Sequence, residues 1–431
     1  MNSQQVLPLF KAFPGLKEKV PRIQILTIIP TAIDRLVELE KELNLSNAQI
    51  YIKRDDKDHD IYGGNKLRKF EFIFADALQN GKTGIMTFGG VGTNHGLASA
   101  IICKELDLKC HLFLAKQPLT WHVQRSLLLG NYFGAKLHYA KNYIGVALKA
   151  LFFRLFHPKH YVILPGGSNL RGFGTPLGTV AFINAVYELK AQINEGITSE
   201  PDAIFVAGGS TGTAAGLIAG CKLVGLKSKV HVVAVSDEMF VNSESIAKNS
   251  NKALEYLQER DPSIPKIHVR EEDFEILQGY LGSEYGVKTK RGVKAVDLVT
   301  ELCGKEMGFK LETTYTGKAM AGLLDFIRED ENKDKTVLFW NTYNSNDLKH
   351  HLEKTEFNWE ELPEQFHQFY EDKKLQCWQL MDCPEDIRKT CPAYLNHEYR
   401  FWKLNVNCKM PSQEQEKAKQ TLQNAVKIED I

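Results

Sequence analysis

The sequence predicts an α/β protein with largely parallel sheets, and two observations support this class. Runs typical of strands alternate with helical runs from GIMTFGG, which begins at residue 84, to VHVVAVS, which ends at residue 236. Three of the strand-like runs end in glycine-rich turns, at residues 89–92, 166–168 and 208–210. Strands joined by helices pair in parallel, and open sheets of this kind bind ligands at the carboxyl ends of their strands. We therefore expect a ligand site at these turns.

The expected elements follow in chain order. A helix should begin at about Asn65, because Leu67, Phe70 and Phe74 recur at helical spacing and asparagine is a good N-cap residue. The strand-like runs after it, each with the helical run that follows, are GIMTFGG and HGLASAIICKEL, CHLFLA and VQRSLLLGNYFG, YVILPGG and GTVAFINAVYELKAQI, AIFVAGG and TAAGLIAGCKLVG, and finally VHVVAVS. After about residue 350 this alternation stops, and the chain becomes aromatic, acidic and cysteine-bearing.

Composition narrows the class of protein. With 431 residues the chain can form two or three domains. Lys+Arg 54 against Asp+Glu 53 gives a net charge of +1, so we expect neither a nucleic-acid partner nor an anionic membrane partner. The longest apolar stretch, IGVALKALFFRLF, is interrupted by Lys149 and Arg154, and the first residues lack the apolar core of a signal peptide. These features predict a soluble, cytoplasmic protein.

The most informative turn lies in FVAGGSTGTAAGL, residues 205–217. A strand-like run ends at Ala207, glycine and hydroxyl residues follow, and a helix of small residues is expected from about Ala214. Glycines let backbone N–H groups converge and the helix dipole attracts an anion, so such a loop typically binds phosphate; a purely structural turn is the alternative. The pattern matches neither Walker A nor the dinucleotide fingerprint. The predicted phosphate ligands are Gly208, Gly209, Ser210, Thr211, Gly212 and Thr213.

Lys66 lies in the first turn of its predicted helix, where the exposed N–H groups disfavour a cation. A lysine in a positive or desolvated setting has a lowered pKa, and only the neutral amine forms a Schiff base with an aldehyde. Pyridoxal 5'-phosphate carries both an aldehyde and a phosphate. Lys69, three residues further on the same face, could direct its charge at that phosphate. The lysine at the helix start and the glycine- and hydroxyl-rich loop together predict this cofactor, with Lys66 as its attachment point.

The motif GGNKLRKFEF resembles the cofactor-lysine motif of fold type II pyridoxal-phosphate enzymes, in the branch of 1-aminocyclopropane-1-carboxylate deaminase and D-cysteine desulfhydrase. The resemblance covers residues 25–345 and includes IPTAIDRL, IYIKRDD, FGGVGTNHG, LPGGSN, SEYG and YTGKAMAGLLD. It implies a homodimer whose chain has two open, mostly parallel three-layer α/β domains. We expect a large cofactor domain from residues 1–65 and 180–350, a small domain from residues 66–179, a cysteine-rich module at 371–410 and a polar tail at 411–431.

The resemblance also implies roles for single residues. Lys66 would hold the cofactor and later remove the α-proton of the substrate, with Tyr315 or Thr93 as its proton partner. Asn94 would bond the phenolic oxygen of the cofactor, and Thr316 would face its pyridine nitrogen. The expected substrate contacts are Thr93, Asn94, His95 and Tyr285.

The resemblance favours α,β-elimination on a small amino acid, giving a 2-oxo acid and ammonia. The cyclopropane deaminases carry glutamate where this chain has Thr316, and a hydroxyl does not keep the pyridine nitrogen protonated as a carboxylate does. The alternatives are 1-aminocyclopropane-1-carboxylate deaminase or an amino-acid racemase on the same cofactor. Two departures from the family leave the substrate open: Thr93 replaces the usual serine, and Tyr343 and Asn344 replace a glycine pair after Thr342.

Four cysteines crowd into a short segment that the family lacks. Because cytosolic thiols stay reduced, we expect zinc or an iron–sulfur cluster there more than disulfides, although the spacing fits neither a zinc finger nor a ferredoxin. A non-catalytic sensor, in which this module answers to metal or redox state, is therefore a second functional class. The cysteines are Cys377, Cys383, Cys391 and Cys408.

Overall fold

The computed structural model describes residues 6–45, 47–117, 119–167, 174–370 and 391. The described residues divide into two compact units, one within residues 1–83 and 161–347 and the other within residues 84–160 and 348–431. The predicted domains divide the chain at 65 and 180 instead. The observed division keeps α3 (Asn65–Gln79) whole, because this helix packs along α7 (Leu177–Asn194) of the same unit. Three of the four C-terminal cysteines lie outside the described residues, and the fourth, Cys391, is a half-buried thiol.

The first unit contains a six-stranded sheet in the order β1-β2-β10-β7-β8-β9. Only the short edge strand β1 is antiparallel to its neighbour; the other pairs are parallel, as the alternation of strands and helices predicts. The strands are β1 (Ile33–Arg35), β2 (Gln49–Lys53), β7 (Ala203–Gly208), β8 (Lys229–Ala234), β9 (Phe274–Leu277) and β10 (Thr336–Trp340).

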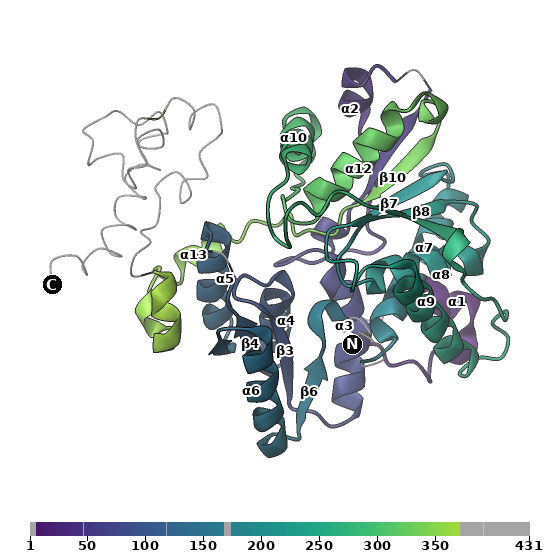
Figure 1. The fold of residues 1–431 in the computed structure, drawn as a ribbon. Coiled ribbons are helices and arrows are strands. Elements are labelled where there is room, and N and C mark those ends of the chain that lie inside the picture. The colour runs from purple at the N-terminus through teal and green to yellow at the C-terminus, as the bar shows by residue number, and fades with distance from the viewer. Residues whose placement is uncertain (1–5, 46, 118, 168–173, 371–390, 392–431) are drawn as a thin grey trace. The chain divides into compact units, whose positions relative to one another are not determined.

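Helices cover both faces of this sheet, which makes the unit a three-layer α/β fold (Figure 1). On one face α10 and α12 bury Val299, Leu323 and Ile327 against the strand residues Phe205 and Phe339. On the other face α7 packs against α3 and α8. The remaining helices of this unit are α1 (Pro8–Ala12), α2 (Val37–Glu42), α8 (Gly212–Val224), α9 (Ser243–Gln258), α10 (Lys290–Val299), α11 (Lys305–Met307) and α12 (Thr316–Arg328).

The second unit is built on the parallel strands β3 (Gly84–Gly90), β4 (Lys109–Ala115) and β5 (Lys136–Ala140), and β6 (His160–Ile163) completes the sheet in the order β5-β4-β3-β6. Its helices are α4 (Asn94–Glu105), α5 (Trp121–Tyr132), α6 (Tyr143–Phe156) and α13 (Lys349–Glu353). The predicted parallel α/β fold is thus confirmed in both units.

The chain beyond the last strand returns to the second unit. Phe366 and Phe369 pack edge-on against Tyr139 of β5, and the Tyr370 hydroxyl donates to the Gln124 carbonyl of α5 at 2.7 Å. Within the described part of the chain, no helix has both the length and the apolar character needed to cross a bilayer.

Candidate active site

The backbone around Lys66 is fixed by glycine. Helix α3 begins at Asn65 as predicted, but its N-cap is Gly64, which adopts φ 112°. A side chain at this position would be strained, and its Cβ would lie 2.7 Å from the Thr342 carbonyl oxygen. The prediction of Asn65 as the N-cap is therefore wrong by one residue, which frees its side chain for another purpose.

The Asn65 side chain joins the lysine to the glycine- and hydroxyl-rich loop. Its Oδ1 accepts a hydrogen bond from Lys66 Nζ at 2.6 Å, and its Nδ2 donates to Thr213 Oγ1 at 2.9 Å. Residues that are 148 positions apart in the chain therefore meet through one amide group. This contact fixes the amine of Lys66 beside the loop that the sequence predicts to bind phosphate.

Burial lowers the pKa of Lys66 to about 8, against an opposing effect of the negative charge on Glu312. A lysine in water has a pKa of about 10.4. The fold therefore provides the amine in a form that loses its proton close to neutral pH, which is the chemical requirement for attack on an aldehyde.

The predicted phosphate loop connects β7 to α8. The helix begins at Gly212, two residues before the predicted start, so the N–H groups of Gly212 and Thr213 lie in its first turn. Thr211 adopts φ 58°, a conformation uncommon for a residue other than glycine, and its Oγ1 accepts a hydrogen bond from Asn249 Nδ2 at 2.8 Å. A Cβ on Gly209 would lie 3.1 Å from Tyr315 Cε1, so a side chain at this position would crowd that ring.

Lys69 is buried, and its Nζ donates to the carbonyl oxygen of Gly166 at 2.8 Å. Burial and then the positive charge of Lys66 hold the pKa of Lys69 well below its ordinary value. Its predicted contact with the cofactor phosphate stays a prediction.

Glu312 organises the N-terminus of α12, and the sequence analysis missed it. Its carboxylate accepts hydrogen bonds from the backbone N–H groups of Thr314 at 2.7 Å, Tyr315 at 2.7 Å and Thr316 at 2.9 Å. The Thr316 hydroxyl is buried and lies 3.3 Å from the same carboxylate. An acidic residue just before a helix is a recognisable capping signal, so the role of Glu312 could have been predicted from the stretch LETTYTGK.

Tyr315 and Tyr285, which the sequence predicts near the reacting atoms, are hydrogen-bonded through their hydroxyl groups. Tyr285 is 45% exposed and lies in the loop that follows β9. Lys318, fully buried in α12, donates from Nζ to the Leu281 carbonyl at 2.6 Å and thereby anchors this loop. The two phenols thus lie at an accessible surface of the first unit.

The turn after β10 holds the glycine pair in front of Lys66. Asn344 Oδ1 accepts from the Gly63 N–H at 2.7 Å and from the Asn346 N–H at 3.1 Å, while its Nδ2 donates to the Asn346 carbonyl at 3.1 Å. Asn344 is one of the two residues that replace the family's glycines. Its amide supports the backbone of the lysine loop from inside the first unit.

Thr93, Asn94 and His95 belong to the second unit, at the start of α4. Thr93 is the N-cap, and its Oγ1 accepts from the Gly96 N–H at 3.2 Å. His95 is buried with Nε2 2.9 Å from Thr87 Oγ1, and Asn94 is half-buried in the first turn. Their predicted contacts with cofactor and substrate stay predictions.

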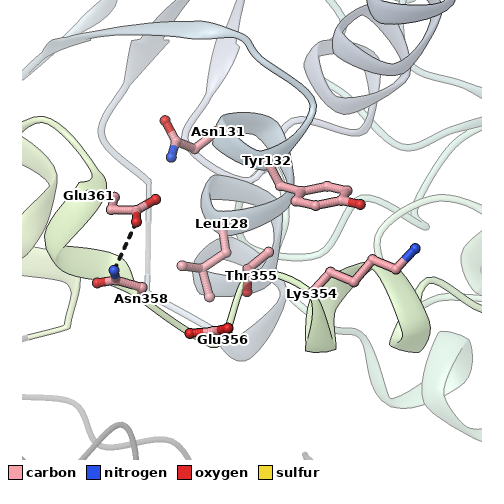
Figure 2. Close-up of a pocket in the computed structure, with 8 residues that line it drawn as sticks. All are labelled: Leu128, Asn131, Tyr132, Lys354, Thr355, Glu356, Asn358 and Glu361. Atoms are coloured by element: carbon pink, nitrogen blue, oxygen red, sulfur yellow. Dashed lines mark hydrogen bonds between the residues drawn. The ribbon is translucent and has the colours of Figure 1, made fainter.

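A pocket of about 250 Å³ on the second unit contains none of the predicted site residues. Figure 2 shows that side chains of α5 and of the returning chain line it, with Asn358 bonded to Glu361 at 3.0 Å. The lining residues are Leu128, Asn131, Tyr132, Lys354, Thr355, Glu356, Asn358 and Glu361.

The residues of the first unit fit pyridoxal 5'-phosphate. A lysine amine of lowered pKa lies beside a helix N-terminus whose loop offers N–H groups and hydroxyls to an anion, and the Asn65–Thr213 hydrogen bond couples the two. Together with the open parallel sheet, these features define the class of α/β enzymes that hold this cofactor on a lysine.

The chain belongs to the pyridoxal-phosphate dependent enzyme family, whose model matches residues 25–342. It is 32% identical over 323 residues to a putative 1-aminocyclopropane-1-carboxylate deaminase of Thermotoga maritima, covering 74% of this chain and 94% of that relative. It is also 32% identical over 338 residues to a D-cysteine desulfhydrase of Salmonella newport, covering 75% and 94%. A crystal structure of an ACC deaminase homologue superposes with a TM-score of 0.63 at 27% identity, covering 81% of this chain and all of that one.

Proposed function

We propose that this enzyme catalyses α,β-elimination on a small amino acid, in the manner of a D-cysteine desulfhydrase, and releases a 2-oxo acid and ammonia. The observation that carries the proposal is the Lys66 amine, with its pKa lowered to about 8 and bonded through Asn65 to the loop at Thr213. When bound, the cofactor supplies an electron-withdrawing ring that stabilises negative charge at the α-carbon of the substrate.

The protein residues would bind, orient and move protons. The N–H groups and hydroxyls of residues 208–213 would hold the phosphate, which fixes the cofactor relative to Lys66. Lys66 Nζ, which Asn65 Oδ1 orients at 2.6 Å, would be the base that takes the α-proton of the substrate. The hydrogen-bonded hydroxyls of Tyr285 and Tyr315 are candidates to deliver a proton to the leaving group.

Thr316 supports elimination over ring opening. Its hydroxyl accepts from the Glu312 N–H at 2.9 Å and lies 3.3 Å from the Glu312 carboxylate, so its orientation is fixed from within α12. A neutral hydroxyl opposite the pyridine nitrogen does not enforce its protonation, and the weaker electron sink suffices for expulsion of a good β-leaving group. Ring opening of 1-aminocyclopropane-1-carboxylate is the second candidate, because the Thermotoga relative is as similar to this chain as the Salmonella one.

The test is a spectrum and an assay on purified protein. The protein should be yellow with bound cofactor, Lys66→Ala should lose the visible band, and Lys248→Ala, which changes an exposed lysine of α9, should keep it. Release of 2-oxo acid and ammonia is then measured with D-cysteine, β-chloroalanine and 1-aminocyclopropane-1-carboxylate. Turnover of the cyclopropane substrate alone would favour the second candidate, and no turnover of any of the three would contradict the proposal.

Two further expectations stay proposals beside this one. A homodimer is expected from the family resemblance and is tested by the mass of the purified protein in solution. Zinc or an iron–sulfur cluster at the C-terminal cysteines is tested by metal analysis, as described below.

A further inference from the structure

The outer face of α6 carries an exposed apolar stripe. Seven of its large side chains are between 60% and 73% exposed, which amounts to on the order of 100 Å² from each. A stripe of this size exceeds the largest apolar patch of most monomeric proteins, and patches of this kind mark interaction surfaces. Its residues are Tyr143, Ile144, Leu148, Leu151, Phe152, Leu155 and Phe156.

The stripe is not the face of α6 that packs against the sheet. Val146 and Ala150 are buried, and Phe153 packs with them against Met86 and Phe113 of the sheet. At 3.6 residues per turn, the six residues from Ile144 to Phe156 cover an arc of roughly 140° on the opposite side of the helix. A helix that covers a sheet with one face normally presents polar residues on the other, so this apolar stripe requires a separate explanation.

The surroundings of α6 are cationic. Residues 108–160, in the same unit as α6, contain eight Lys and Arg and not one Asp or Glu, although 53 acidic residues in 431 would place about six or seven in a stretch of this length. The five glutamates of residues 348–370 of this unit lie in the returning chain. Lys149 and Arg154 lie on the two flanks of the stripe, and Lys141 and Lys159 lie at its two ends. The net charge of the whole chain, +1, conceals this local excess.

These cations have no carboxylate partner among the described residues. Lys149 Nζ donates to the Tyr139 carbonyl at 2.5 Å, and an Arg154 nitrogen donates to the Pro158 carbonyl at 2.8 Å. No ion pair in the described part of the chain includes a residue of the stretch from 108 to 187. Within the described residues, the positive charge around the stripe is therefore not neutralised by direct ion pairs.

We propose that α6 docks on an anionic lipid surface, with its apolar stripe in the interface and its lysine and arginine flanks against the headgroups. A helix with leucine and phenylalanine on one face and basic residues beside it binds membranes in this way, and each basic residue near the surface adds to the attraction. A second copy of the chain is a poorer occupant, because two-fold pairing of the stripe would bring the same cationic flanks together. The inference does not depend on the proposed activity.

The test is sedimentation of the full-length protein with phospholipid vesicles, either neutral phosphatidylcholine or phosphatidylcholine with about 30% phosphatidylglycerol. We expect binding to the anionic vesicles, weaker binding at high salt, and little binding to the neutral ones. The double variant L151E/L155E should bind at least about tenfold more weakly. The matched control L78E/I197E introduces the same two charges at a 38% exposed leucine and a 46% exposed isoleucine of the first unit and should bind like the wild type.

A second variant separates the contribution of the apolar stripe from that of the basic residues. K141Q/K159Q leaves the stripe intact and should reduce binding to anionic vesicles while leaving any binding to neutral ones unchanged. Thermal unfolding of each variant should match the wild type, since all of the changed side chains are exposed.

Three results would overturn the proposal. If L151E/L155E binds the vesicles as well as the wild type does, the apolar stripe is not part of the contact. If the wild type binds neutral and anionic vesicles equally, the basic residues do not contribute to binding. Absence of vesicle binding would exclude the lipid surface; if the wild type is then a dimer that L151E/L155E converts to a monomer, the occupant is a second copy.

Discussion

Replacing Glu312 with glutamine should destabilise the start of α12 and lower the pKa of Lys66 further. The carboxylate accepts three backbone N–H groups at 2.7–2.9 Å, and its negative charge is the influence that raises the pKa of Lys66 against burial. Glutamine has about the same size but only one acceptor oxygen, so the substitution removes charge and acceptors with little change in packing.

The expected magnitude follows from these contacts. Hydrogen bonds to a charged group contribute about 1.5–3 kcal/mol, and loss of a helix cap costs about 0.5–2 kcal/mol. Because the amide oxygen can still accept one or two of the three N–H groups, Glu312→Gln should lower the free energy of unfolding by about 2 kcal/mol. Urea unfolding of the cofactor-free protein measures this change.

The pKa of Lys66 is measured by trapping a small aldehyde on the cofactor-free protein with borohydride at a series of pH values, followed by peptide mapping. In the wild type the yield at Lys66 should rise with a midpoint near pH 8, and in Glu312→Gln the midpoint should lie lower. The control is Glu329→Gln, which removes a carboxylate from the other end of the same helix. An unchanged or raised midpoint in Glu312→Gln would refute the inferred link between Glu312 and Lys66.

Three further predictions follow from the structure. Cofactor-free Lys66→Met should be more stable than the wild type at pH 7, because the fold disfavours a charged Lys66, and this gain should shrink as the pH rises from about 8 towards the ordinary lysine pKa of 10.5. Urea unfolding across that range measures it, and a constant gain would contradict the lowered pKa. Asn344→Ala should leave the buried Gly63 N–H without its acceptor, lower the free energy of unfolding by about 1–3 kcal/mol and weaken cofactor retention. The surface substitution Asn358→Ala should change neither property, and equal effects of the two substitutions would contradict this role of Asn344. The purified protein should contain zinc or iron that is lost on Cys391→Ser, as metal analysis would show; metal-free protein with reactive thiols would contradict the predicted site.

Local patterns made the core of the site predictable. The first turn of α3 and the loop at 208–213 are each readable from fewer than fifteen residues, because helix starts and glycine-rich loops have local causes. The hydrogen bond between Asn65 and Thr213 was not predictable, since it joins two elements distant in the chain. Assigning Asn65 as the cap missed it, because the φ of 112° at Gly64 moves the cap one residue back and turns the asparagine to a tertiary contact.

Other features escaped prediction for reasons of length or context. Strands β1 and β9 have three and four residues, too few for a period of two to be distinguished from chance. From the sequence, Asn344 is recognisable only as the replacement of a glycine. Its contribution is a hydrogen bond from the Gly63 N–H, and only the fold brings this group next to it. A residue that departs from a family motif can thus stabilise a site. Whether it stabilises or destabilises the site depends on the hydrogen-bond partner that the fold brings to it.

The net charge of the chain does not describe the charge around individual sites. Lys66 is one of 54 basic residues, yet its proton affinity is set by burial and by a single carboxylate, Glu312. The cations near α6 belong to the same total, yet residues 108–160 around them contain no Asp or Glu, and none of these cations forms a described ion pair. Electrostatic energy falls off within about 10 Å at ordinary salt, so the charge that governs a site is the charge of its immediate neighbourhood. A nearly neutral chain can therefore combine a lysine of lowered pKa in one unit with a locally basic stretch around α6 in the other.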